Sequence, residues 1–527
     1  MDALTRAATT GTSRDAVPAS GLPTDDLLGS TKRSPERNLL LRAGMHAVYS
    51  AAGRMAESGV EAPGPAPEET MPACSAKAAE IMRRLLVAQR TEILREALDR
   101  LHQAGLRVPH ALLPTALDVQ LTALRSAVAA VLGERGLWLA TQNPDWGWAV
   151  ATRVSEEGDE TTWEEGALGE RISTLRRVRG QNPSVGLAWV EDDWKSEKAD
   201  ARVAMVEALE TGLSTGDEGF LERALDDRSV RVREAAAALL ARIPGSDYAG
   251  RALARADAIL VRYEPPAGGL RGVAAGLSRR GHAGRLVVEP PDHPDEGWRR
   301  DLPGDMPEHG VGEKAWRISR ALSVVTPTHW EKHFGVSPSD LIAAARGDWE
   351  TALLAGWSQA SVSHRESSWA VPLWRACYLL EHDLEGWQTW HIALSMADLL
   401  PQSELALTIG QLPKNGEMPF RLSSTLQAIS DPWHPDLSEA FLAGLRRRIS
   451  GIYQYGPAEG EEPWVTALPH ASISLASGCL EQASGFRDSL ERCPGLPDHA
   501  LRRWGPELER FEETLELRRK LVEEIPL

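Results

Sequence analysis

A pair of helical segments joined by a short acidic turn, in Asp217–Ile243, constrains the fold more than any other part of the sequence. The second segment reads V-R-E-A-A-A-A-L-L, in which small alanines let neighbouring helices approach closely while larger residues fill the core. The turn residues Asp226 and Asp227 can accept hydrogen bonds from the free N–H groups that open the next helix. The segment Ala201–Leu209 matches this pattern about 31 residues earlier. A period of this length is typical of solenoids, in which stacked helix pairs bury one another's apolar faces.

The unit resembles a HEAT repeat, and its candidate repeat-turn residues are Asp226, Asp227 and Arg233. Apolar residues at helical spacing predict further short helices on both sides of it. One of them is Tyr248–Leu260, and the last is Pro506–Val522, with Pro506 placed in the first turn, where its missing N–H costs nothing. We therefore expect an all-α fold, a HEAT-like α-solenoid.

A stretch rich in Gly, Pro and Arg interrupts the helical pattern between residues 263 and 312. It contains the strand-like run Arg285–Glu289, which Pro290 and Pro291 end. We interpret it as an insertion with a short strand or hairpin. A chain of 527 residues is too long for a single compact core. We therefore divide it into four regions: an N-terminal helical region (1–165), a HEAT-like repeat region (166–262), the insertion (263–312) and a C-terminal region of degenerate helical repeats (313–527).

The charge balance argues against general nucleic-acid binding. The chain has 58 Lys and Arg against 75 Asp and Glu, a formal charge of −17, and an acidic surface repels phosphate backbones. Its four cysteines form no C-x-x-C pair, which fits a reducing compartment. Neither an apolar leader segment nor a run of about 18 apolar residues is present. We therefore expect a cytoplasmic protein without a membrane span.

Tryptophan is unusually frequent, with 18 residues against 6 Phe and 6 Tyr. Trp138, Trp146 and Trp148 flank an Asn-Pro-Asp turn, and Trp387 and Trp390 lie one helical turn apart. Indoles can anchor interfaces or stack on bases and sugars. Our preferred interpretation is structural: the indoles fill the space between irregular helices.

The insertion holds the candidate functional loop. Carboxylates, an imidazole, an indole and a guanidinium lie close together in its sequence, at Glu289, Asp292, His293, Asp295, Trp298 and Arg299. Oxygen-rich loops can bind Ca²⁺ or Mg²⁺. The prolines and the absence of EF-hand spacing instead favour a turn whose acids cap the next helix. The loop remains the preferred location for a specific site, because irregular segments on rigid scaffolds often carry function.

No sequence motif assigns a catalytic, cofactor-binding or metal-ligating residue. His329 and His333 lie four residues apart, but a zincin requires H-E-x-x-H, and in H-W-E-K-H the acid Glu331 stands one position too late. G-x-G-x-x-G and the phosphate-loop motif do not occur. We therefore expect neither a cofactor nor a metal, and we favour a non-catalytic protein over an enzyme.

The chain as a whole resembles a bacterial family known only as a domain of unknown function. The resemblance rests on Val131–Trp148, the unit Asp217–Ile243 and Val287–Asp301, with weaker matches at Ala7–Arg14 and Ala47–Gly53. Genes of such families lie near SWIM-type zinc-finger proteins, MoxR-like AAA+ ATPases and von Willebrand A-type proteins. The resemblance thus implies an accessory or scaffolding role and transfers no catalytic residue.

Two functions remain open. The first is a non-catalytic adaptor or scaffold that binds a protein partner, such as an AAA+ ATPase or a zinc-finger protein. The alternative is an enzyme or ligand-binding protein with a site at the 263–312 insertion. An adaptor should expose a long surface without a deep polar pocket, whereas an enzyme should direct buried carboxylates or histidines into a cavity.

Overall fold

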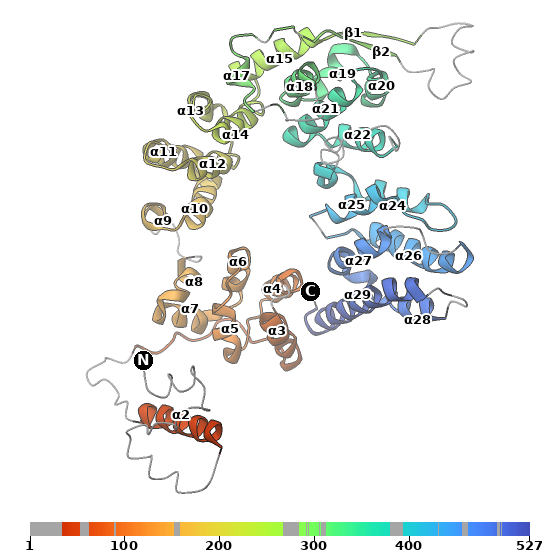
Figure 1. Cartoon of the computed structure of the whole chain (residues 1–527). Coiled ribbons are helices and arrows are strands. Elements are labelled where there is room, and N and C mark those ends of the chain that lie inside the picture. Colours follow the sequence, from red (N-terminus) through yellow and green to blue (C-terminus); the bar gives the residue numbers. More distant parts are fainter. Residues whose placement is uncertain are drawn as a thin grey trace. The chain divides into compact units, whose positions relative to one another are not determined.

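The computed structural model describes residues 34–52, 63–88, 91–151, 159–266, 284–290, 292–293, 295–304, 306, 312–379, 394–430, 432–455, 462–492, 496 and 498–526. The chain divides into two units, Met1–Ala66 and Pro67–Leu527. The described part of the first unit contains one helix, α2 (Pro35–Ala52) (Figure 1). All that follows concerns the second unit.

The second unit begins with short helices that surround a core of their own. They are α3 (Ala76–Ala88), α4 (Thr91–Gln103), α5 (Leu113–Leu117), α6 (Thr122–Ala130), α7 (Gly133–Gln142) and α8 (Trp148–Ala151). Apolar residues that recur at helical spacing on α3 and α4, such as Leu85, Leu94 and Leu101, are almost fully buried. The sequence pattern therefore does define the face that packs inward.

The next helices form the region with the repeat-like sequence. They are α9 (Asp159–Glu165), α10 (Leu168–Gln181), α11 (Pro183–Asp193), α12 (Ala199–Ala208), α13 (Glu218–Ala224), α14 (Val230–Leu240) and α15 (Asp247–Ile259). Helix α10 packs on α11 and α12, and α14 packs on both α12 and α13. Successive helices thus bury their apolar faces against their neighbours in sequence, as a solenoid requires.

The insertion contains an antiparallel hairpin of β1 (Leu260–Glu264) and β2 (Arg285–Val288), followed by the short helix α17 (Trp298–Asp301). Leu260 pairs with Val288 and Glu264 with Arg285, with a register shift between Leu260 and Arg262. The predicted strand is confirmed. The prediction that Leu260 ends a helix is wrong, because α15 stops at Ile259 and Leu260 opens β1.

The remaining helices continue to the end of the chain. They are α18 (Glu313–Ser323), α19 (Thr328–Phe334), α20 (Pro338–Ala344), α21 (Glu350–His364), α22 (Ser367–Leu379), α24 (Gln402–Gly410), α25 (Phe420–Gln427), α26 (Pro435–Tyr455), α27 (Pro463–Ser474), α28 (Phe486–Glu491) and α29 (Asp498–Glu524). Short 3₁₀ turns at His110–Leu112, Pro144–Trp146, Thr215–Asp217, Ala397–Leu399 and Ser477–Gln482 join some of them. The all-α, solenoid-like fold with a strand insertion is confirmed.

One helix start was predicted wrongly. Pro506 lies inside α29, not in its first turn, because the helix already begins at Asp498. Trp504 and Ala500, on the additional turns, are buried. Their packing offsets the backbone hydrogen bond that an internal proline removes.

Most of the described tryptophans are packing residues. Seven indoles are almost completely buried: Trp330, Trp357, Trp369, Trp374, Trp433, Trp464 and Trp504. Trp357 packs edge-on against Trp369 with ring centroids 5.4 Å apart, and the Trp464 indole donates to the Gly416 carbonyl at 2.8 Å. Trp387 and Trp390 lie outside the described residues. The structural interpretation holds for these seven, which wedge between helices.

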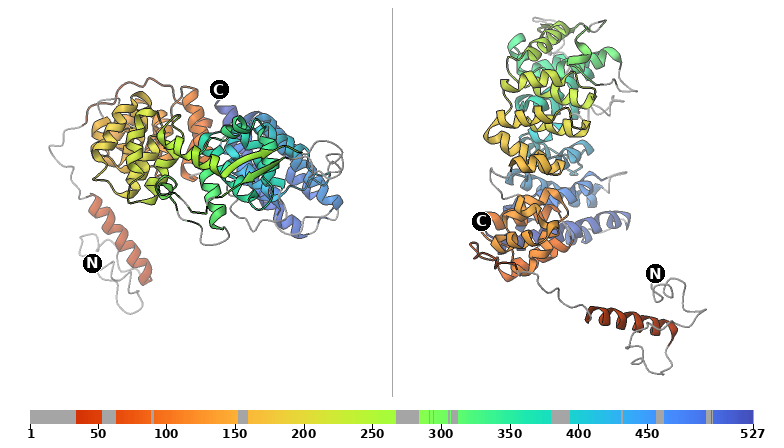
Figure 2. Two further views of the ribbon diagram at one scale, coloured as in Figure 1. Left: turned by 90° about the horizontal axis from the view of Figure 1, so that it is seen from above. Right: turned by 90° about the vertical axis from the view of Figure 1, so that its left-hand side faces the viewer.

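The first helices of the second unit pack against its last helix. Leu521 and Ile525, at the end of the chain, complete the apolar core of α3–α8. Arg518 of α29 donates to both oxygens of Glu96 of α4, at 2.6 and 3.2 Å. Figure 1 shows α29 beside α3 and α4, and in Figure 2 the blue C-terminal helices lie next to orange ones (Figures 1 and 2). Segments more than 400 residues apart in sequence therefore share one interface.

None of the helices in the described ranges combines the length and the apolar character that a bilayer crossing requires.

Candidate functional site

The predicted repeat-turn residues connect neighbouring helices. Asp227 accepts a hydrogen bond from the Ser229 amide at 2.8 Å, next to the start of α14, and forms an ion pair with Arg202 of α12 at 2.9 Å. Arg233 donates to the Asp227 carbonyl at 2.8 Å. Asp226 accepts from Arg300 of the insertion at 2.8 Å. The turn therefore forms polar contacts with α12, α14 and the insertion.

The predicted loop carboxylates do not gather around one point. Asp292 accepts from Lys314 at 2.7 Å, whereas Asp295 accepts from Arg255 at 2.7 Å. The backbone amide of Glu289 donates a hydrogen bond to the Ile259 carbonyl at 2.9 Å. Glu289, Asp292, His293 and Asp295 belong to no group of potential metal ligands within the described ranges. Asp292 and Asp295 thus pair with separate cations of the scaffold.

A buried carboxylate that the sequence analysis did not single out fastens the insertion. Asp301 of α17 accepts hydrogen bonds from Arg251 at 2.8 Å and Arg255 at 2.7 Å, both on α15. Its backbone carbonyl accepts from the Tyr248 hydroxyl at 2.6 Å. Burial by itself would raise the pKa of Asp301, but the two arginines hold the pKa below its ordinary value. Asp301 is therefore charged at neutral pH and stabilises the folded insertion.

Replacing Asp301 with asparagine should lower the free energy of unfolding at pH 7 by about 2–3 kcal/mol, since Arg251 and Arg255 lose a buried charged acceptor. The folded-state pKa is depressed, so this stabilisation is present above the unfolded pKa and disappears as the pH falls through the folded pKa. Urea unfolding of both proteins at decreasing pH measures the difference, which should shrink in acid. Asp292→Asn, at an exposed ion pair, should have little effect. A pH-independent difference would contradict this account.

A cavity of about 410 Å³ lies beside the insertion. Its lining includes Arg233, Trp298 and Arg299, three residues that the sequence analysis selected, together with Trp316 and Arg317. Trp298 is 4% exposed, and its indole N–H has no acceptor among the described residues. The cavity thus combines guanidinium groups and indoles with one carboxylate, that of Glu313, which pairs with Arg317. Because cationic groups outnumber this carboxylate, the lining suits an anionic or planar ligand.

A second, larger cleft lies where the first and last helices of the second unit meet. It has a volume of about 900 Å³ and is lined by α4, α6, α25 and α27 and by the residues after α25 and α27. Apolar residues such as Ile429 and Ile473 line it, together with Arg95, Asp99 and His470. Its volume lies near the upper end of the range for ligand pockets.

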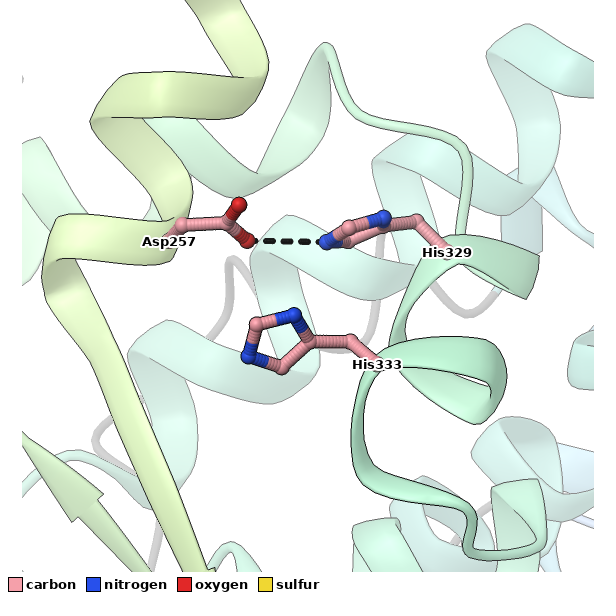
Figure 3. A group of neighbouring side chains, drawn as sticks. All are labelled: Asp257, His329 and His333. Carbon is pink, nitrogen blue, oxygen red and sulfur yellow. Dashed lines mark hydrogen bonds and ion pairs between the residues drawn. The ribbon is translucent and has the colours of Figure 1, made fainter.

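His329 and His333 meet a third potential ligand, Asp257 (Figure 3). His329 Nε2 lies 2.8 Å from Asp257 Oδ1, and the two imidazole rings are 5.3 Å apart between centroids. One ligand atom of each residue lies within 4.8 Å of the others. Glu331 points elsewhere and accepts from the Trp369 indole at 2.7 Å, so a zincin arrangement is absent from this helix.

The fold, the insertion and these cavities define an all-α, solenoid-like protein with a two-stranded insertion. The chain belongs to the family of unknown function DUF5691, whose family model matches residues 3–525. Searches of curated proteins and of solved structures gave no match.

Proposed function

We propose that this protein is a non-catalytic solenoid adaptor, with α10–α15 as HEAT-type repeats, and that it binds a protein partner at the cleft between α4, α6, α25 and α27. The observation that carries this proposal is the cleft itself. Its volume of about 900 Å³ has room for several side chains of a partner, and it is lined by both apolar and charged residues, as protein interfaces are.

The buried carboxylates of the described residues are all paired with arginines, and this pairing favours an adaptor over an enzyme. The buried carboxylates Asp217, Asp301 and Glu462 each bind an arginine at 2.7–2.9 Å. None of the three lines either of the two cavities described above. They are therefore structural charges, which makes them poor candidates for acid–base catalysis in those cavities.

One imidazole does line the cleft. His470 Nε2 lies 3.1 Å from Ser474 Oγ, one turn later on α27, and burial lowers the pKa of His470 below its ordinary value. A neutral imidazole beside a hydroxyl is also found in nucleophilic sites. Because His470 lines the proposed docking cleft, His470→Ala should weaken partner binding in an adaptor, whereas in an enzyme it should abolish the chemical activity.

The family resemblance suggests the class of partner. We propose an AAA+ ATPase or a zinc-finger protein acting in the cytoplasm, where the described cysteines Cys74, Cys377 and Cys479 stay as free thiols. The strongly acidic chain, with a formal charge of −17, makes a nucleic-acid partner unfavourable.

Ala123→Arg should weaken partner recovery by a factor of about 10 or more, because it places a large charged side chain on an exposed position of the cleft. The measurement is affinity purification of the tagged full chain from cytosol of its native cell, with quantitative mass spectrometry. Ala238→Arg is the matched control, since it alters an exposed alanine on α14 that does not line the cleft. Equal recovery with both variants, or no specific companion with the wild-type chain, would refute the proposal.

A second candidate function is the binding of an anionic small molecule in the cavity beside the insertion. The observation that favours it is that three guanidinium groups, those of Arg233, Arg299 and Arg317, line one cavity. This candidate gains support if affinity purification recovers no companion while a small carboxylate or phosphate compound raises the melting temperature of the wild-type chain.

A further inference from the structure

We propose that Asp257, His329 and His333 form a binding site for a divalent transition-metal ion, with Zn²⁺ as the ion that fits best. The proposal does not depend on the adaptor function and uses neither of the two cavities. It rests on three side chains from two helices that no motif in the sequence connects (Figure 3).

The donor set is suited to zinc. Two imidazole nitrogens and one carboxylate oxygen are common zinc ligands, and three protein ligands leave the fourth tetrahedral position for water. Imidazole donors also suit Co²⁺, Ni²⁺ and Cu²⁺, whereas Mg²⁺ and Ca²⁺ prefer sites made of oxygen atoms. The chemical class of the ligand is therefore a borderline divalent cation.

The observed distances are close to those that coordination needs. Ligand atoms bound to zinc at about 2.0–2.1 Å lie roughly 3.3 Å apart in a tetrahedron. Here Asp257 Oδ1 and His329 Nε2 are 2.8 Å apart, and the ligand atoms of all three residues lie within 4.8 Å of one another. Rotation of exposed or half-exposed side chains can close this difference without moving a helix.

The helix that carries both histidines is firmly anchored. Between them, Trp330 is fully buried, and Glu331 accepts the Trp369 indole hydrogen bond at 2.7 Å. The helix ends at Gly335, whose φ of 66° favours glycine. Because the backbone of α19 is fixed by these contacts, the two imidazoles face α15 together, as a preorganised site requires.

A simpler explanation is that His329 and Asp257 form an ordinary ion pair and that His333 lies nearby by chance. The two explanations differ in the role of His333. Its side chain is exposed and takes no part in the hydrogen bond between His329 and Asp257, so a simple ion pair does not need it. A metal ion would need it as the third ligand.

The described cysteines are poor competitors for the ion. Cys74, Cys377 and Cys479 are buried, and burial raises the pKa of all three thiols, in Cys377 to about 11. A metal ion binds the thiolate, so thiols that stay protonated at neutral pH bind it weakly. This leaves the histidine pair as the strongest donor set that the described cysteines and histidines offer.

Binding of an ion at this site would connect α15, which precedes the insertion, with α19, which follows it. Asp257 lies on α15, before the hairpin, and His329 follows 72 residues later on α19. A ligand that binds only the folded arrangement raises the melting temperature, and the rise grows with the logarithm of the free ligand concentration above the Kd. Zinc should therefore stabilise the full chain against heat.

Isothermal titration of the metal-free full chain with ZnCl₂ tests the proposal. We expect one ion per chain at this site, a rise in melting temperature with zinc, and an intense visible absorption with Co²⁺ that reports tetrahedral coordination. His333→Ala should weaken zinc binding more than about 100-fold and abolish the thermal shift, because it removes one of three ligands.

His434→Ala is the matched control. His434 is also exposed and lies 3.6 Å from the carboxylate of Asp436, but no second imidazole accompanies that pair in the described residues. This variant should bind zinc as the wild-type chain does. If His333→Ala and His434→Ala bind zinc equally, or if zinc leaves the melting temperature of the wild-type chain unchanged, the ion is adventitious only and the site is refuted.

Discussion

Replacing Arg179 with methionine should destabilise the protein by about 3–5 kcal/mol, the cost of leaving a buried charge without its partner. Arg179, on α10, is completely buried and donates to both oxygens of Asp217 at 2.9 and 3.0 Å. It also donates to four backbone carbonyls, those of Pro183, Leu209, Thr211 and Gly212, at 2.7–3.2 Å. The variant therefore loses a charge pair and leaves carbonyls at the end of α12 without a donor.

Urea unfolding followed by circular dichroism measures this effect, and Arg176→Met is the control. Arg176 is exposed on the same helix, so its replacement should change the free energy of unfolding by no more than about 0.5 kcal/mol. The double variant Arg179→Met/Asp217→Asn should recover part of the loss, because it removes the unpaired charge. A single Arg179→Met variant as stable as the wild-type protein would contradict the role of this pair.

Local patterns in the sequence predict the helices around this pair well. The unit Asp217–Ile243 contains α13 and α14, and its Asp-Asp turn is the place where the two helices meet. The reason is that each helix is specified by the spacing of its own apolar residues and by the residue that caps it. The strand-like run Arg285–Glu289 is also predicted from local residues, because Pro290 and Pro291 directly after it end the strand.

Features that depend on distant partners are not predicted. Leu260 continues the helical spacing of α15, and only its pairing with Val288 makes it a strand residue. Asp257 has no recognisable spacing to His329, because a hairpin and, among the described residues, the helices α17 and α18 separate them. A search for an acidic residue on the helix before the insertion could have suggested Asp257, but nothing in the sequence shows that α15 faces α19.

The structure brings two residues of the candidate loop to one cavity. Trp298 and Arg299 line it with Arg233, a residue selected for a different reason. Asp292 and Asp295 of the same loop are bound by a lysine and an arginine of the scaffold. A carboxylate can pair with a cation of the scaffold or bind a ligand. Composition alone cannot show which of the two it does, because the residue type is the same in both cases.

Replacing Arg518 with leucine should loosen the contact between the first and last helices of the second unit, at a cost of about 3 kcal/mol. Arg518 is 3% exposed and binds Glu96 of α4 through two hydrogen bonds, at 2.6 and 3.2 Å. It also donates to the carbonyls of Ser472 and Leu475, at 3.1 and 2.9 Å. A single guanidinium thus connects α4, α27 and α29.

Hydrogen exchange with mass spectrometry locates the effect. Amides of α3, α4 and the end of α29 should exchange faster in Arg518→Leu, whereas those of α10–α15 should not change, because local opening follows local contacts. Arg519→Leu is the matched control, since this neighbouring arginine is 34% exposed and pairs with Glu516 of its own helix. Faster exchange throughout the chain would show general destabilisation instead. Unchanged exchange at α3 and α4 would mean that the apolar contacts of Leu521 and Ile525 hold this interface together without the buried charge.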